Sequence, residues 1–131
     1  MNNSFQFVNA SECENILVLT LLLPRVESYE VAETMGGELV AAVGDKASPR
    51  VVLDMSKLVY MSSVGYGPLI SLRAFIREAG GRLILCQLSP VVKEMFETTR
   101  LLINPQSPHS LFEFAETKDR ALDLFGLEFV I

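Results

Sequence analysis

Apolar residues along the chain fall into short continuous runs and into stripes that recur every three or four positions. The continuous runs have the length of buried strands, and they cover residues 16–23, 51–53 and 82–86. The stripes have the period of amphipathic helices, and they cover residues 31–43, 69–79 and 92–96. Strands that alternate with helices in this way favour crossover connections and a parallel sheet.

Weaker patterns lie near both ends of the chain. Residues 5–8 alternate between apolar and polar, and we predict that they form a hairpin with the first run across the polar residues 9–15. Residues 111–114 also alternate and predict a late strand. Residues 118–125 predict a last helix, which Thr117 can cap.

Glycine and proline residues mark where the helices weaken, begin and end. Gly36-Gly37 falls inside the first helical stripe and weakens it by about 1 kcal/mol per glycine relative to alanine. Gly80-Gly81 is a strong stop signal for the second helix, and Ser89-Pro90 opens the third with a capping serine. The sequence therefore predicts one α/β domain over residues 1–131, with a mixed, largely parallel sheet and about four helices packed against it.

Composition and charge narrow the classes of partner. Eleven basic residues against sixteen acidic ones give a net charge of −5, which argues against a nucleic-acid groove or an anionic membrane surface. The N-terminal residues lack the features of a signal peptide, and the longest apolar run is too short to span a bilayer, so we expect a cytoplasmic protein. Cys13 and Cys86 lie outside any cluster of metal-ligating residues, so we expect free thiols, no metal and no cofactor.

Two motifs and a glycine pair carry a resemblance to a known family. Residues 51–56 read Val-Val-Leu-Asp-Met-Ser, residues 61–67 read Met-Ser-Ser-Val-Gly-Tyr-Gly, and Gly80-Gly81 follows the next helix. In this order and spacing they resemble the STAS domain, which anti-sigma factor antagonists share with the cytoplasmic tails of sulphate transporters. The resemblance extends over about residues 16–122 and implies a STAS-like fold of the stand-alone antagonist type.

The resemblance implies a non-catalytic bacterial signalling protein that regulates transcription. In such antagonists an anti-sigma factor that is also a kinase phosphorylates a serine of the turn, and the unphosphorylated form binds that anti-sigma factor. By position the phospho-acceptor is Ser63, with Ser62 as the second candidate. This sequence departs from the family pattern because Ser62 replaces an aspartate, Val64 replaces a second serine and Arg100 replaces a glycine.

We predict that the partner binds at the turn and helix over residues 61–76. The candidate contact residues are Asp54, Ser62, Ser63, Gly65, Tyr66, Gly67 and Arg73. A serine hydroxyl just before a helix can accept a hydrogen bond from a free backbone N–H, so Ser62 and Ser63 are also expected to cap the helix. The alternative to a phosphorylation site is that these two serines are capping residues and nothing more. Phosphate added there is tolerated by the helix N-terminus, so the fold should survive while a partner surface packed on the turn should not.

Other functions stay open beside the antagonist. One alternative is a constitutive STAS scaffold, and another is a nucleotide- or small-ligand-sensing module that uses the backbone at Gly65-Tyr66-Gly67, although Pro68 removes a donor there. A hydrolase is disfavoured, because Met61 occupies the first glycine position of a nucleophile elbow and His109 has no charged residue near it in sequence. A homodimer is left open.

Overall fold

The core of the fold is a five-stranded mixed sheet with the strand order β1-β2-β4-β6-β7. The computed structural model describes residues 5–99 and 112–126. The strands of this sheet are β1 (Val8–Cys13), β2 (Ile16–Leu21), β4 (Arg50–Asp54), β6 (Arg82–Cys86) and β7 (Glu113–Ala115). β1 is antiparallel to β2 and every other pair is parallel, as predicted for a mixed, largely parallel sheet.

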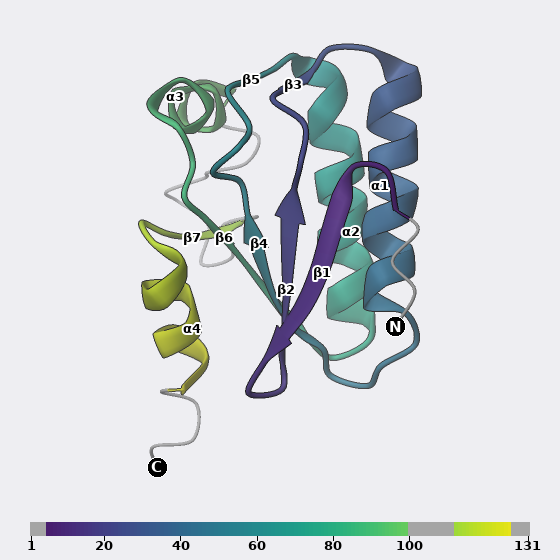
Figure 1. Ribbon diagram of the computed structural model, residues 1–131, viewed down its shortest axis with the longest axis vertical. Coiled ribbons are helices and arrows are strands. Elements are labelled where there is room, and N and C mark those ends of the chain that lie inside the picture. The colour runs from purple at the N-terminus through teal and green to yellow at the C-terminus, as the bar shows by residue number, and fades with distance from the viewer. Residues whose placement is uncertain (1–4, 100–111, 127–131) are drawn as a thin grey trace.

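Helices cover both faces of this sheet (Figure 1). Helices α1 (Tyr29–Val43) and α2 (Tyr66–Glu78) pack side by side on one face, and α4 (Lys118–Gly126) packs on the other. Helix α3 (Pro90–Thr99) lies beside β5 (Tyr60–Met61), which pairs with β3 (Arg25–Val26) in a separate two-stranded sheet. None of the helices within the described ranges is long and apolar enough to cross a membrane.

The continuous apolar runs arise because the central strands are buried on both faces. In β2, Leu17 and Leu19 pack into the core beneath α1 and α2, whereas Ile16 and Val18 pack into the core beneath α4. Successive side chains of a strand point to opposite faces, so a strand covered on both sides must be apolar at every position. This confirms the three strands predicted from continuous runs.

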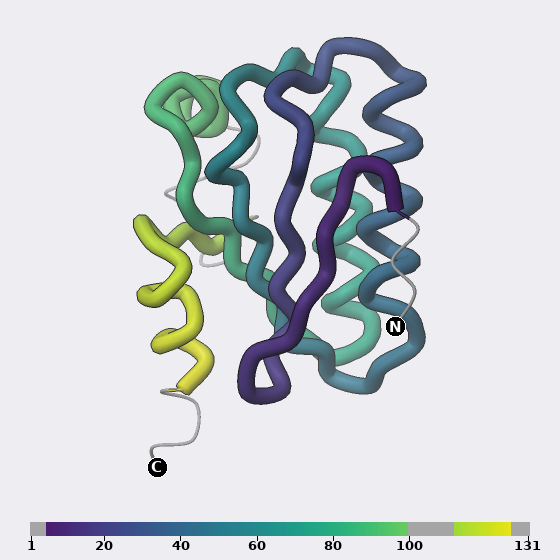
Figure 2. The backbone as a smooth tube through the Cα atoms, in the orientation of Figure 1, coloured from purple at the N-terminus to yellow at the C-terminus, as the bar shows by residue number. Residues whose placement is uncertain are grey.

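The N-terminal hairpin exists, but the prediction of its first strand at residues 5–8 is wrong. β1 covers Val8–Cys13 rather than residues 5–8, and the polar stretch assigned to the connection forms most of the strand. The turn consists of Glu14 and Asn15 alone, with φ angles of 51° and 70°, which asparagine adopts readily. β1 is a sheet edge and is largely exposed, so its sequence does not need to be apolar (Figure 2).

The predicted capping residues of the later helices are confirmed. Ser89 Oγ accepts a hydrogen bond from the Val92 amide at 3.3 Å, and Thr117 Oγ1 accepts one from the Arg120 amide at 3.1 Å. The late strand predicted over residues 111–114 is β7, which begins two residues later, at Glu113. His109 and Arg100 lie outside the described residues.

Candidate functional site

The turn between β5 and α2 is held by backbone hydrogen bonds. The Ser62 amide donates to the Val26 carbonyl at 2.9 Å, which ties the turn to β3. The Gly65 amide donates to the Ser62 carbonyl at 3.0 Å and closes a short 3₁₀ helix, Ser63–Gly65, ahead of α2. Gly65 is buried against the Met61 side chain, and a side chain at position 65 would collide with it. The glycine is therefore required by close packing.

The prediction that a serine hydroxyl caps the helix is wrong. Ser62 occupies the N-cap position of the 3₁₀ helix but its side chain makes no capping hydrogen bond, and the N-cap of α2 is Gly65. The 3₁₀ turn uses the Ser62 backbone carbonyl in place of its hydroxyl. Ser63 is exposed and Ser62 is half-buried. Capping therefore does not account for either hydroxyl.

A groove of about 570 Å³ opens between this turn and α3. Its walls are Tyr60, Ser62, Ser63 and Tyr66 from the turn, and Val91, Glu94, Met95, Thr98 and Thr99 from α3. The contact of α3 with β5 brings together two segments that are about thirty residues apart in the sequence (Figure 1). Val91 is 51% exposed, so it leaves apolar surface at the groove.

An aromatic cluster fixes the position of α3 relative to the turn. The ring of Phe96 is fully buried and makes edge-to-face contacts with Tyr66, Phe112 and Phe114, with ring centroids 5.4, 5.8 and 5.6 Å apart. These separations and near-perpendicular planes are the favoured geometry of aromatic pairs. Tyr66 is thus a structural contact between α2 and α3 as well as a wall of the groove.

The Tyr66 hydroxyl oxygen is buried, and it has no partner at hydrogen-bonding geometry among the described residues. Burial raises the pKa of the Tyr66 phenol, and the nearby Thr99 side chain opposes the rise. Glu94 is the one charged side chain among the described residues that line the groove. The groove thus combines apolar surface, hydroxyl groups and one negative charge.

Four of the seven predicted contact residues do not line the groove. Gly65 is buried under the turn, and Gly67 is exposed in the first turn of α2. The other two are Asp54 and Arg73. Asp54 is only 5% exposed, its Oδ1 accepts a hydrogen bond from the Ser56 amide at 2.9 Å, and its Oδ2 lies 3.8 Å from Lys118 Nζ. It therefore organises the end of β4 rather than offering a contact surface. Arg73 lines a different cavity at the far end of α2.

The α3 residues of the groove were missed in the sequence. Met95 is half-buried: it packs against the core and also lines the groove together with Val91. Val91 and Met95 are four residues apart and therefore lie on one face of α3, next to the buried stripe of Val92 and Phe96. An apolar face wider than the core needs is the signal that could have identified them.

The remaining groups that could bind a metal in the described part of the chain are acidic side chains and two thiols. There, no three His, Cys, Asp or Glu side chains are grouped so that they could hold a metal ion. Cys13 is exposed and Cys86 is buried, and both are free thiols. Burial, with a smaller contribution from the negative charge of Asp54, raises the pKa of Cys86 to about 12.

The sheet order and the helix layers define a small α/β domain with a groove at the start of α2. The STAS domain model matches residues 9–113, and this chain belongs to the STAS domain family. It is 37% identical over 108 residues to BtrV of Bordetella bronchiseptica, which is named as a candidate anti-sigma factor antagonist. The match covers 82% of this chain and 86% of that relative.

Solved structures of similar proteins share the fold. An anti-sigma-factor antagonist (STAS) domain protein from Planctomyces limnophilus superposes with a TM-score of 0.75 at 22% identity, covering 91% of this chain and 97% of the other. The anti-sigma factor antagonist SpoIIAA in its unphosphorylated form gives a TM-score of 0.67 at 19% identity, covering 91% and 96%. At these identities the likeness establishes the architecture, and it confirms the STAS-like fold expected from the sequence.

Proposed function

We propose that the protein is a cytoplasmic, non-catalytic anti-sigma factor antagonist whose partner is an anti-sigma factor with kinase activity. The partner binds at the turn and helix over residues 61–76, and α3 supplies the other wall of the binding groove. The observation that carries this proposal is the groove itself, in which Ser62, Ser63 and Tyr66 lie beside the exposed side chains of α3. The relationship to BtrV supports the antagonist class.

The surface chemistry of the groove supports a protein partner. Aromatic and methionine side chains are enriched in protein interfaces, and Tyr60, Tyr66 and Met95 line the groove together with the exposed Val91. Covering a half-exposed aliphatic side chain with a partner removes apolar surface from water and therefore favours binding. The partner is therefore expected to bring an apolar side chain into this groove.

We further propose that phosphorylation of Ser63 switches the interaction off. Ser63 is exposed at the rim, and phosphate there would add about 1.5 to 2 negative charges. Glu94 already places a negative charge in the groove, and none of its described lining residues is basic. The added charge would remain hydrated and would oppose the entry of an apolar group. Description of the SpoIIAA structure as the unphosphorylated form supports a phosphorylated state in the family.

The test of the switch uses the protein from its own host together with the kinase that co-purifies with it. We expect ATP and that kinase to add one phosphate, mapped to Ser63 by mass spectrometry, and to dissociate the complex. Ser63→Ala should abolish both effects, and Ser63→Glu should weaken binding. Ser11→Ala and Ser11→Glu are matched controls, because Ser11 is exposed on β1, outside both the groove and residues 61–76. Stable binding without any modification would contradict the switch and favour the constitutive scaffold.

The test of the surface is a charge placed in the groove. Val91→Asp should weaken partner binding by about fivefold or more, as loss of an important apolar contact costs more than about 1 kcal/mol. Leu22→Asp is the control, since Leu22 is an exposed aliphatic residue that lies outside both the groove and residues 61–76. Equal loss of affinity in both variants, or no loss in either, would show that the partner binds elsewhere.

A further inference from the structure

A second cavity, of about 360 Å³, lies at the C-terminal end of α2 and the first residues of β6. Arg73 and Arg77 of α2, the Gly80–Gly81 turn, Arg82, Leu83 and Glu113 line it. The groove described above lies at the opposite end of α2. Arg73, which the sequence analysis gives as a candidate contact residue, lines this cavity and does not line the groove.

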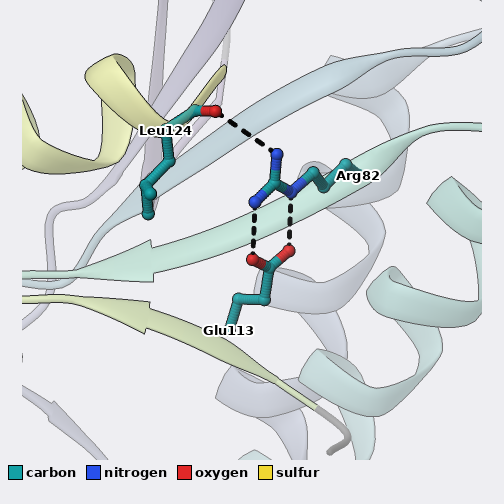
Figure 3. Close-up of polar contacts among 3 residues, drawn as sticks. All are labelled: Arg82, Glu113 and Leu124. Carbon is teal, nitrogen blue, oxygen red and sulfur yellow. Dashed lines mark hydrogen bonds and ion pairs between the residues drawn. The ribbon is translucent and has the colours of Figure 1, made fainter. Parts of the chain in front are cut away.

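The one carboxylate in this lining is already committed to one of the three arginines (Figure 3). Glu113 accepts two hydrogen bonds from Arg82, at 2.7 Å from Nε to Oε1 and at 2.7 Å from Nη2 to Oε2. Arg82 Nη1 also points to the Leu124 carbonyl at 3.5 Å, and the guanidinium lies over the ring of Phe125 at 5.3 Å. This bidentate geometry uses both carboxylate oxygens of Glu113, so its charge is offset by Arg82.

Arg73 and Arg77 have no ion pair or hydrogen bond from their side chains within the described residues. They are four residues apart, so they lie one above the other on one face of α2. Partial burial, and to a smaller extent the positive charge of Arg77, lower the pKa of Arg73. The helix C-terminus favours a cation in its last turn, which accounts for Arg77. It does not account for a second, half-buried arginine beside it.

We propose that Arg73 and Arg77 form a binding site for a ligand that carries a phosphate or diphosphate group. Among the described residues, three arginines and one glutamate line the cavity, which gives this lining an excess of two positive charges in a protein of net charge −5. A dianion matches that excess, whereas a single carboxylate would neutralise half of it. The planar guanidinium groups donate hydrogen bonds in the geometry that phosphate oxygens accept.

The surroundings of the two arginines fit a small ligand. The backbone N–H groups of Gly80 and Gly81 are occupied, since they donate to the carbonyls of Arg77 and Ile76 at 2.9 Å each. Recognition therefore rests on the guanidinium groups. Leu83 is 7% exposed and provides an apolar floor, which strengthens the charge interaction above it. The volume lies at the lower end of the range of small-molecule sites.

The test is a titration of the isotopically labelled chain with pyrophosphate at constant ionic strength, followed by amide chemical shifts. We expect saturable shifts confined to the second half of α2 and to the start of β6. Arg73→Gln and Arg77→Gln should each weaken binding by about tenfold or more, the effect of losing a charge-assisted hydrogen bond. Lys57→Gln is the matched control, because Lys57 is exposed beyond the opposite end of the parallel strands and should leave the affinity unchanged.

Shifts that do not saturate, that spread over all basic residues or that persist in both arginine variants would overturn the site. So would saturation by a glutamate-rich peptide with no response to pyrophosphate. A nucleoside diphosphate that binds more tightly than pyrophosphate identifies a nucleotide as the ligand, and equal affinity identifies the phosphate group alone. Val91→Asp should bind pyrophosphate normally, so this result is independent of the partner groove. Circular dichroism confirms that each variant is folded.

Discussion

Gly36 and Gly37 are neighbours in α1, yet only the replacement of Gly37 with alanine is expected to stabilise the protein. A Cβ atom built on Gly37 has nothing within 4 Å, whereas one built on Gly36 lies 2.9 Å from Cβ of Pro68 in α2. Pro68 is 3.5 Å away at Cα and 3.6 Å away at Cγ. The close approach of α1 and α2 therefore requires a glycine at position 36 but not at position 37.

The magnitudes follow from helix propensity and packing. Alanine is better than glycine inside a helix by about 0.8–1.0 kcal/mol, so Gly37→Ala should stabilise the protein by about that amount. Gly36→Ala gains the same propensity term, but the Cβ–Cβ separation must grow by about 0.6 Å to reach ordinary contact distance. Such overpacking costs about 1–3 kcal/mol against a rigid proline ring. The net result is a loss of about 0–2 kcal/mol.

The assay is equilibrium unfolding in urea followed by circular dichroism at constant pH. Gly37→Ala should raise the midpoint and Gly36→Ala should lower it or leave it unchanged, with the slope constant in both. In thermal unfolding each 1 kcal/mol corresponds to about 4 °C in Tm for a chain of this size. A Gly36→Ala protein that is stabilised as much as Gly37→Ala would refute the packing argument, because it would show that α1 and α2 separate without cost.

Four further predictions concern the aromatic cluster and the thiols. Tyr66→Phe should stabilise the fold by about 1 kcal/mol in urea unfolding, because it removes a buried hydroxyl that has no partner in the described part of the chain; a loss of stability would reveal a hydrogen bond to that hydroxyl. Phe96→Ala should cost about 3–5 kcal/mol in the same assay, and a cost under about 1 kcal/mol would mean that α3 is not anchored by this ring. In the native protein at pH 8 a thiol reagent should label Cys13 and not Cys86. The free energy of unfolding should also fall as pH rises from about 9 to about 12, because the Cys86 thiol stays protonated in the folded protein at pH values where it ionises in the unfolded chain. Cys86→Ala should make this decline less steep.

The local pattern of the sequence determined the central strands and the four helices. β2, β4 and β6 are apolar at nearly every position because helices cover both of their faces, and this composition is visible without the fold. The caps at Ser89 and Thr117 depend on residues within four positions, so they too could be predicted. The STAS-like turn over residues 61–67 was likewise identified from its own residues.

Elements that depend on distant neighbours could not be predicted in this way. β1 is an exposed edge strand with a polar sequence, and its pairing with β2 determines its structure. The β3–β5 pair has only two residues per strand, too short for any periodic pattern. Ser62 resembles a capping residue, but the 3₁₀ turn is closed by its backbone carbonyl, so the hydroxyl is left at the groove.

The candidate site shows the same division. The sequence by itself determined that a serine-containing turn precedes a helix, and it identified Tyr66 and the two serines as candidates. Only the tertiary structure decided that α3 forms the other wall, that Asp54 is buried and that Arg73 faces a separate basic cavity. The physical reason is that the periodicity of the sequence shows which face of a helix is buried. It does not show which element covers that face, or which side chains stay exposed where two elements meet, because both depend on how the elements pack.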